Sequence, residues 1–69
     1  MKNVLTIRQD LQQQIETRLR SYNYNDSEIA KLLIIYRASI LEWQQSYLVT
    51  GTHVSPENMA DDIVFSERL

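Results

Sequence analysis

Apolar residues recur at helical spacing along most of the chain. Over residues 11–22 they fall on one face of a helix, and the positions between them are mainly glutamine, glutamate and arginine. The apolar positions are Leu11, Ile15, Leu19 and Tyr22. Asp10 precedes Gln13 at the spacing of a capping box, which predicts that this first helix begins directly after Asp10. Asn23 or Asn25 is expected to end it, because asparagine tolerates the left-handed conformation found at helix C-termini.

A second helix follows at once and is far more apolar. Asn25 and Glu28 repeat the capping-box spacing, and the helical pattern continues to about Val49. The apolar stripe consists of Ile29, Leu32, Leu33, Tyr36, Ile40, Trp43 and Tyr47, and Ile34, Ile35, Leu41 and Leu48 lie off it. Residues 29–41 are therefore apolar almost all the way round. Two short helices cannot easily cover every side of such a helix, so a second copy of the chain is expected to do so.

The last part of the chain predicts a third, short helix. Gly51 is the only glycine and a natural helix terminator. Ser55 as N-cap and Pro56 at the first helical position then signal a new start, and the helix is expected over residues 56–66. It is expected either to pack back on the core or to form an arm that folds on a partner protein. If it packs back, the apolar contacts would come from Met59, Ile63 and Phe65, with Asp61 and Asp62 facing water.

The opening residues, 3–9, permit two interpretations. As a strand, their side chains alternate between two faces. One face would carry Leu5 and Ile7, and the other Val4, Thr6 and Arg8. As a helix, Val4, Ile7 and Leu11 share a face, so periodicity alone does not decide. The β-branched residues and the expected cap at Asp10 favour the strand.

A lone strand of this length needs a neighbour for its backbone N–H and C=O groups. The same strand of a second copy would supply one, forming a two-stranded antiparallel ribbon on a two-fold axis. Such a ribbon fits the major groove of DNA, where arginine can bind guanine through two hydrogen bonds. Thr6 and Arg8 are then expected to read bases, and Lys2 to contact phosphate.

The order of a strand and two helices over residues 2–43 resembles the ribbon-helix-helix DNA-binding superfamily. The resemblance rests on VLTIR for the ribbon, DLQQQIETRL for the first helix and NDSEIAKLLIIY for the second. It implies a dimeric repressor or antitoxin that reads operator DNA with the ribbon and contacts a phosphate at the start of the second helix. The implied DNA-binding residues are Lys2, Val4, Thr6, Arg8, Asn25 and Ser27. The chain departs from the family at Gln9, where a third inward apolar residue is usual, and it has no glycine between the helices.

The size of the chain also favours oligomerisation. Its 69 residues form one domain near the lower limit for an independent fold, and it has no cysteine for disulfides or thiolate metal sites. The expected fold class is mainly α: a short N-terminal strand, two helices and a short C-terminal helix in an intertwined homodimer. The dimerising core would comprise residues 1–50, with residues 52–69 as an acidic helix or arm. The alternative is an all-α three-helix bundle.

Charge is unevenly spread, and this supports a second function class. Residues 1–40 carry six basic and four acidic side chains, whereas residues 41–69 carry one basic and five acidic. The alternative to a DNA-binding protein is a helical protein–protein interaction module, such as an inhibitor or adaptor. Its partner would bind Met59, Asp61, Asp62, Ile63 and Phe65.

No catalytic motif, cofactor loop or metal-ligand cluster is recognisable in the sequence, so no enzyme activity, cofactor or metal is expected. The one histidine, His53, follows the glycine and is expected to be an exposed loop residue. Without a signal pattern or a long apolar run, the chain is expected to be cytoplasmic, with no membrane contact.

Overall fold

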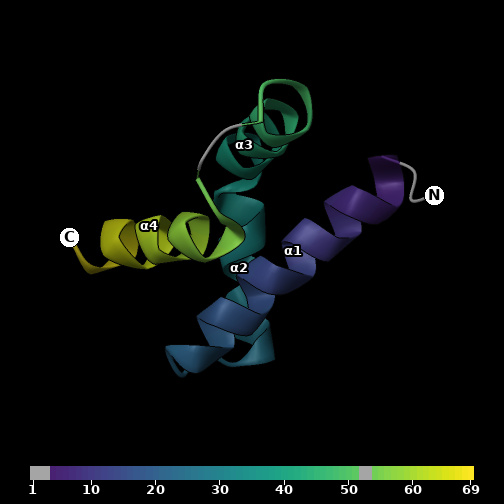
Figure 1. Ribbon diagram of the computed structural model, residues 1–69. Helices are drawn as coiled ribbons and strands as arrows, with labels where there is room; N and C mark the ends of the chain where they lie inside the picture. Colours follow the sequence, from purple (N-terminus) through teal and green to yellow (C-terminus); the bar gives the residue numbers. More distant parts are fainter. Residues whose placement is uncertain (1–3, 52–53) are drawn as a thin grey trace.

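The part of the chain that the structure describes folds into four α-helices (Figure 1). The computed structural model describes residues 4–51 and 54–69, and no β-strand is present in that part. The helices are α1 (Val4–Ser21), α2 (Asp26–Ile35), α3 (Arg37–Val49) and α4 (Pro56–Arg68). The mainly α prediction is confirmed, and the all-α alternative is nearer the structure than the strand-containing one, with four helices in place of three. None of the described helices has the length and apolar character needed to cross a membrane.

The predicted N-terminal strand is wrong, because α1 is already helical at Val4. Asp10 therefore lies inside α1 and does not cap it. The register explains the outcome: Ile7, Leu11 and Ile15 fall on one helical face, and Ile7 packs against the core that Leu11 and Ile15 enter. Strand propensity depends strongly on context, and here burial of this helical face outweighs the preference of the β-branched residues.

Two contacts with α3 hold the first turns of α1 in place. The Arg8 guanidinium donates to the Gln45 side-chain oxygen at 2.9 Å. The Gln44 amide, although buried, donates to the Arg8 backbone carbonyl at 3.3 Å. The first turns of α1 therefore pack against a helix of the same chain. Their backbone groups do not need hydrogen bonds to a strand from a second copy.

The turn between α1 and α2 agrees with its sequence signals. Asn23 adopts the left-handed conformation, with φ of 72°, just after α1 ends. Asn25 and Glu28 form the predicted capping box: the Asn25 side chain accepts from the Glu28 N–H at 2.8 Å, and the Glu28 carboxylate accepts from the Asn25 N–H at 3.0 Å.

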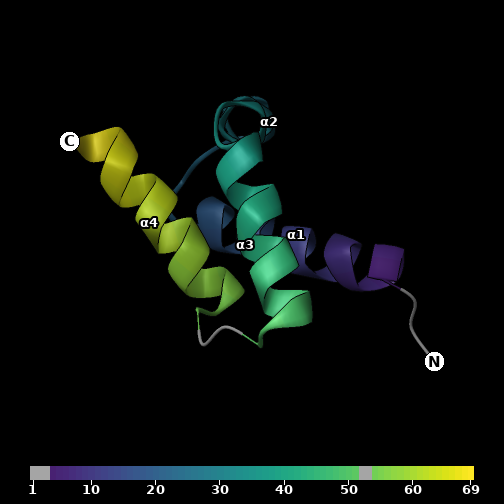
Figure 2. The ribbon, with the colours of Figure 1, turned by 90° about the horizontal axis from the view of Figure 1, so that it is seen from above.

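The predicted continuous helix from Asn25 to Val49 is wrong in one respect, because it breaks at Tyr36. Tyr36 has φ of −98° and ψ of 17°, outside the α-helical range, and separates α2 from α3. Figure 2 looks along α2 while α3 runs across the view, so the two axes differ sharply in direction. The break lets α2 and α3 enclose the core from two directions, which a straight helix of this length could not do.

The predicted third helix is confirmed as α4. The Ser55 side chain accepts from the Asn58 N–H at 3.1 Å and Pro56 occupies the first turn, as its sequence signals indicate. α4 packs mainly on α1. The buried apolar residues are Leu11, Ile15, Leu19, Ile29, Leu32, Ile40, Trp43, Ala60, Ile63 and Val64. Trp43 also donates to the Val54 carbonyl at 3.0 Å, which fixes the entry to α4 against α3.

Candidate protein interaction surface

The most exposed apolar side chain within the described helices, Ile34, lies at the break between α2 and α3. Ile34 is 75% exposed and Ile35 is 62% exposed, although both stand in a helix whose other face is core. Leu41, one turn into α3, is also exposed. Isolated apolar residues are common on protein surfaces, but neighbouring ones beside a groove are typical of interaction sites.

A groove of about 350 Å³ adjoins these residues, and its lining includes residues before and after the break at Tyr36. We call it the α2–α3 groove. Its lining residues are Gln12, Leu33, Ile34, Arg37, Ile40, Leu41 and Gln44. They come from α1, α2 and α3, and none comes from α4. Figure 1 places α4 on the opposite side of α2 from the N-terminal half of α1, so α4 of the same molecule leaves the groove uncovered.

Two cations flank Ile34 without an acidic partner. Lys31 precedes it by three residues on the outer face of α2, and Arg37 follows it by three and lines the groove. Neither side chain makes a hydrogen bond or ion pair within residues 4–51 and 54–69. An apolar groove with free positive charge at its edge favours a partner that carries apolar side chains next to carboxylates.

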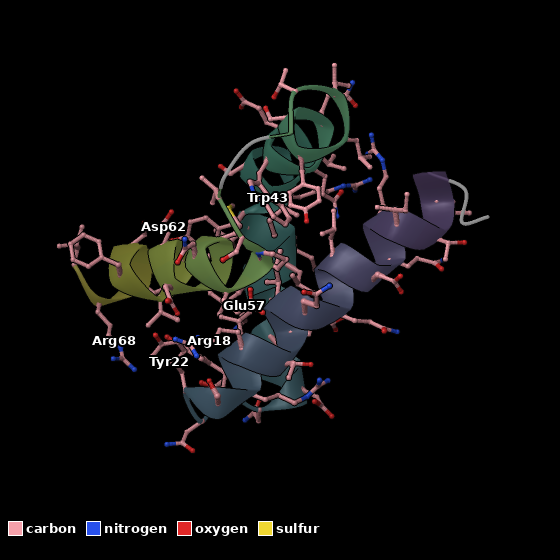
Figure 3. All side chains as sticks on the ribbon, in the orientation of Figure 1. Arg18, Tyr22, Trp43, Glu57, Asp62 and Arg68 are labelled. Carbon is pink, nitrogen blue, oxygen red and sulfur yellow. The ribbon has the colours of Figure 1, made fainter. Side chains whose placement is uncertain are left out.

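A polar cluster fastens the other side of the molecule, where α4 crosses the C-terminal half of α1 (Figure 3). The Arg18 Nε–H donates to Asp61 Oδ1 at 3.0 Å, and the Tyr22 hydroxyl donates to the same oxygen at 2.7 Å. The Arg18 and Arg68 guanidinium groups each lie 5.5 Å from the Tyr22 ring centre, within range of a cation–π interaction. This cluster uses its own charges internally and so acts as a clasp between α1 and α4.

The clasp perturbs the ionisation of its members. Hydrogen bonds from Arg18 and then from Tyr22 lower the pKa of Asp61 below its ordinary value of 3.8. The hydrogen bond to Asp61 is the main reason that the pKa of Tyr22 lies above 10.0, with burial adding to it. The pKa of Arg18 is also raised, first by its hydrogen bond to Asp61.

Of the predicted partner-binding residues, three line one smaller groove. Met59, Asp62 and Ile63 face Tyr36, together with Ser39 and Ser66, around a groove of about 180 Å³. Burial, and then the nearby Glu67 carboxylate, raises the pKa of Tyr36. Ile63 is buried and belongs to the core of this chain, so its side chain is largely committed to the fold.

The other two predicted partner-binding residues lie elsewhere on α4. Asp61 is engaged in the clasp. Phe65 was expected to pack on the core if α4 docked, and that detail is wrong: it is 67% exposed. Asp62, Phe65 and Leu69 follow each other at steps of three and four and are all exposed, so they share the outer face of α4. Figure 3 marks Asp62 on this helix.

The predicted DNA-binding residues are not brought together. Lys2 lies outside the described residues, while Val4, Thr6 and Arg8 belong to the first turns of α1. Asn25 and Ser27 follow the far end of α1, about 20 Å away along that helix. Ser27 stands between the carboxylates of Asp26 and Glu28 in the first turn of α2.

No group of three or more histidine or acidic side chains is positioned to bind a metal ion among the described residues. His53, like Lys2, falls outside them.

Sequence patterns identified the aliphatic residues that line the α2–α3 groove as apolar helix positions but did not identify the groove itself. Ile34 and Leu41 stood out only as positions off the main stripe. The missing signal was the break at Tyr36, which has neither proline nor glycine to mark it. Residues 29–41 contain more apolar side chains than one helical stripe requires. This excess was the one indication in the sequence of a second contact surface.

Comparisons with protein-family models, curated proteins and solved structures found no match to this chain. The resemblance to the ribbon-helix-helix superfamily thus remains a prediction, and the strand that carried it is replaced by helix from Val4 onward.

Proposed function

We propose that this chain is a small helical protein–protein interaction module, of the adaptor or inhibitor type, that holds part of another protein chain in its α2–α3 groove. The observation that carries the proposal is the exposure of Ile34 beside that groove, 75% in a side chain of purely apolar character. Covering it would remove apolar surface from water without rearranging the core.

The surrounding residues support binding of a helix over other modes of protein recognition. An extended peptide would need a free sheet edge, and residues 4–51 and 54–69 include no strand. A proline-rich peptide would need an aromatic groove, whereas the lining here is aliphatic with glutamine and arginine. The remaining common mode places the apolar face of an amphipathic helix in a groove, and the aliphatic residues at this site suit it.

Site-specific photo-crosslinking in the organism that encodes the chain tests the proposal. A photoreactive amino acid at Ile34 is expected to yield a discrete protein adduct. The same group at Gln14 serves as control, because Gln14 is exposed on the side of α1 away from Gln12 and the groove. The adduct should disappear when Leu41→Asp is added to the Ile34 probe. Equal labelling from both positions, or none from Ile34, would refute the assignment.

DNA binding is not proposed in its place. The ribbon interpretation required residues 4–8 to be extended, and they are helical. DNA contact through other residues stays a prediction that no feature described above favours.

A further inference from the structure

The outer face of α4 has the chemistry that the α2–α3 groove requires. Phe65 is exposed at its centre, and Asp62 lies three residues before it, also exposed. Asp62 makes no hydrogen bond or ion pair among the described residues, in contrast to Asp61. This face therefore presents a free aromatic anchor next to a free carboxylate, on a preformed helix.

We infer that the occupant of the α2–α3 groove is α4 of a second copy of this chain. The inference rests on the proposed function and names the partner for the same groove. Phe65 of one molecule would cover Ile34 and Leu41 of the next, and Asp62 would approach Arg37 or Lys31. Aromatic side chains, phenylalanine included, are enriched in protein interfaces, and buried anchors that fill pockets contribute much of the binding energy.

Charge complementarity supports this pairing. The charged residues three positions before and after Ile34, Lys31 and Arg37, are both cations that are unpaired within the described residues. Three positions before Phe65 is the Asp62 carboxylate, likewise unpaired there, and three positions after it the Arg68 guanidinium lies over the Tyr22 ring. The same polarity holds along the chain: residues 1–40 carry a net charge of +2 and residues 41–69 a net charge of −4. Opposite charges facing each other guide two molecules into one orientation, while like faces repel.

The positions of the two surfaces determine the geometry of assembly. Figures 1 and 2 both place α4 and the N-terminal half of α1 on opposite sides of the molecule, and the groove lies on the α1 side. A contact between unlike surfaces on opposite sides is head-to-tail. It leaves one free groove and one free α4 face at the ends of every dimer, so assembly continues into a ring or an open chain.

The contact is expected to be weak. Its apolar centre consists of a few side chains on each molecule, well below the roughly 800 Å² per partner of a stable interface. Self-association should therefore be measured up to about 1 mM protein, at low salt, where charge pairing is least screened.

Sedimentation equilibrium with two half-blocked variants tests the inference. Ile34→Asp disables the groove and Phe65→Asp disables the α4 face. Both positions are exposed, so the fold should persist, and circular dichroism checks this. The wild-type chain is expected to exceed the dimer mass as its concentration rises. Each variant alone should bind itself roughly tenfold more weakly or worse. An equimolar mixture of the two variants should form dimers and nothing larger. The intact α4 face of Ile34→Asp can bind the intact groove of Phe65→Asp, and no other intact surfaces remain.

Two further variants complete the experiment. Val49→Asp places the same charge at an apolar position 68% exposed on α3, outside both surfaces, and should leave self-association unchanged. Arg37→Glu should weaken assembly, and Asp62→Lys in the same chain should restore it. A wild-type chain that stays monomeric at all concentrations would overturn the inference, as would a dimer whose formation Ile34→Asp abolishes but Phe65→Asp does not.

The outcomes separate the two proposals. If the Ile34 probe crosslinks to a different protein and the pure chain stays monomeric, the groove binds another partner: the proposed function stands and the second copy is excluded. If the probe yields no adduct of any kind, the proposed function fails as well.

Discussion

Ile29 and Ile34 offer a matched test of the packing of α2. They are the same residue type in one helix, yet Ile29 is 2% exposed and Ile34 is 75% exposed. Replacing a buried isoleucine with alanine costs about 2–5 kcal/mol, because apolar surface is lost and a cavity remains. Fully burying an isoleucine contributes roughly 1.5–3 kcal/mol, so the covered quarter of Ile34 contributes about 0.4–0.7 kcal/mol. The better helix propensity of alanine offsets a few tenths of a kcal/mol of this. Ile34→Ala should therefore change stability by less than about 0.5 kcal/mol.

Urea unfolding followed by circular dichroism measures both effects. A core of this size supplies only roughly 3–5 kcal/mol in total, so Ile29→Ala is expected to be largely unfolded in water. Ile29→Val, with an expected cost of about 0.5–1.5 kcal/mol, keeps the comparison quantitative. Dilute protein is used so that self-association does not contribute. A loss of 2 kcal/mol or more for Ile34→Ala in dilute solution would refute the arrangement of α2. The same loss confined to high protein concentration would instead locate Ile34 in an interface between copies.

Three further outcomes are expected. Gln9→Pro should destabilise the fold by up to about 3 kcal/mol in urea unfolding, because proline interrupts a helix that already runs through this exposed position. Gln9→Ala should not destabilise it. Tolerance of the proline would favour a helix that starts later. Because the folded-state pKa of Asp61 is depressed, the contribution of Asp61 to stability is complete above pH 3.8 and is lost as the pH falls through the lower folded-state pKa. The free energy of unfolding should therefore fall over that acid range, and it should fall less steeply in Asp61→Asn. An identical pH profile for the variant would rule out the clasp as the cause of the acid destabilisation. Trp43→Phe should cost about 1–3 kcal/mol in thermal or urea unfolding, because it removes the indole N–H that donates to the Val54 carbonyl near the core. A neutral effect would mean that this hydrogen bond does not hold the entry to α4.

Local signals in the sequence predicted most of the helical boundaries. The capping box at Asn25, the left-handed Asn23 and the Ser55–Pro56 start all appear in the structure as expected. Gly51 likewise adopts φ of 65° after α3. Each of these helix starts and ends depends on a side chain and backbone groups within four residues of each other. Such short-range features can be predicted from the sequence alone.

The predictions that failed depend on contacts between distant residues. The first turns of α1 have strand-favouring side chains, but their partners are Gln44 and Gln45, more than thirty positions away. Nothing near residues 4–8 indicates that contact. The capping-box spacing at Asp10 does not mark a helix start, because α1 begins at Val4 and Asp10 lies inside it.

The break at Tyr36 links the fold to the proposed function. Residues 29–41 contain more apolar side chains than one core-facing stripe can bury, so any arrangement of this chain alone leaves some of them in water. A straight helix would spread that surplus along its length. By changing direction at one residue, the chain gathers Ile34 and Leu41 around a single concave site. A concave apolar site binds a protruding side chain more effectively than scattered residues do, because contact on several sides removes more surface from water. The conformation of Tyr36 therefore determines whether the surplus stays scattered over the surface or gathers at the proposed docking site. A variant that straightens this junction should lose the proposed self-association even with Ile34 and Phe65 intact.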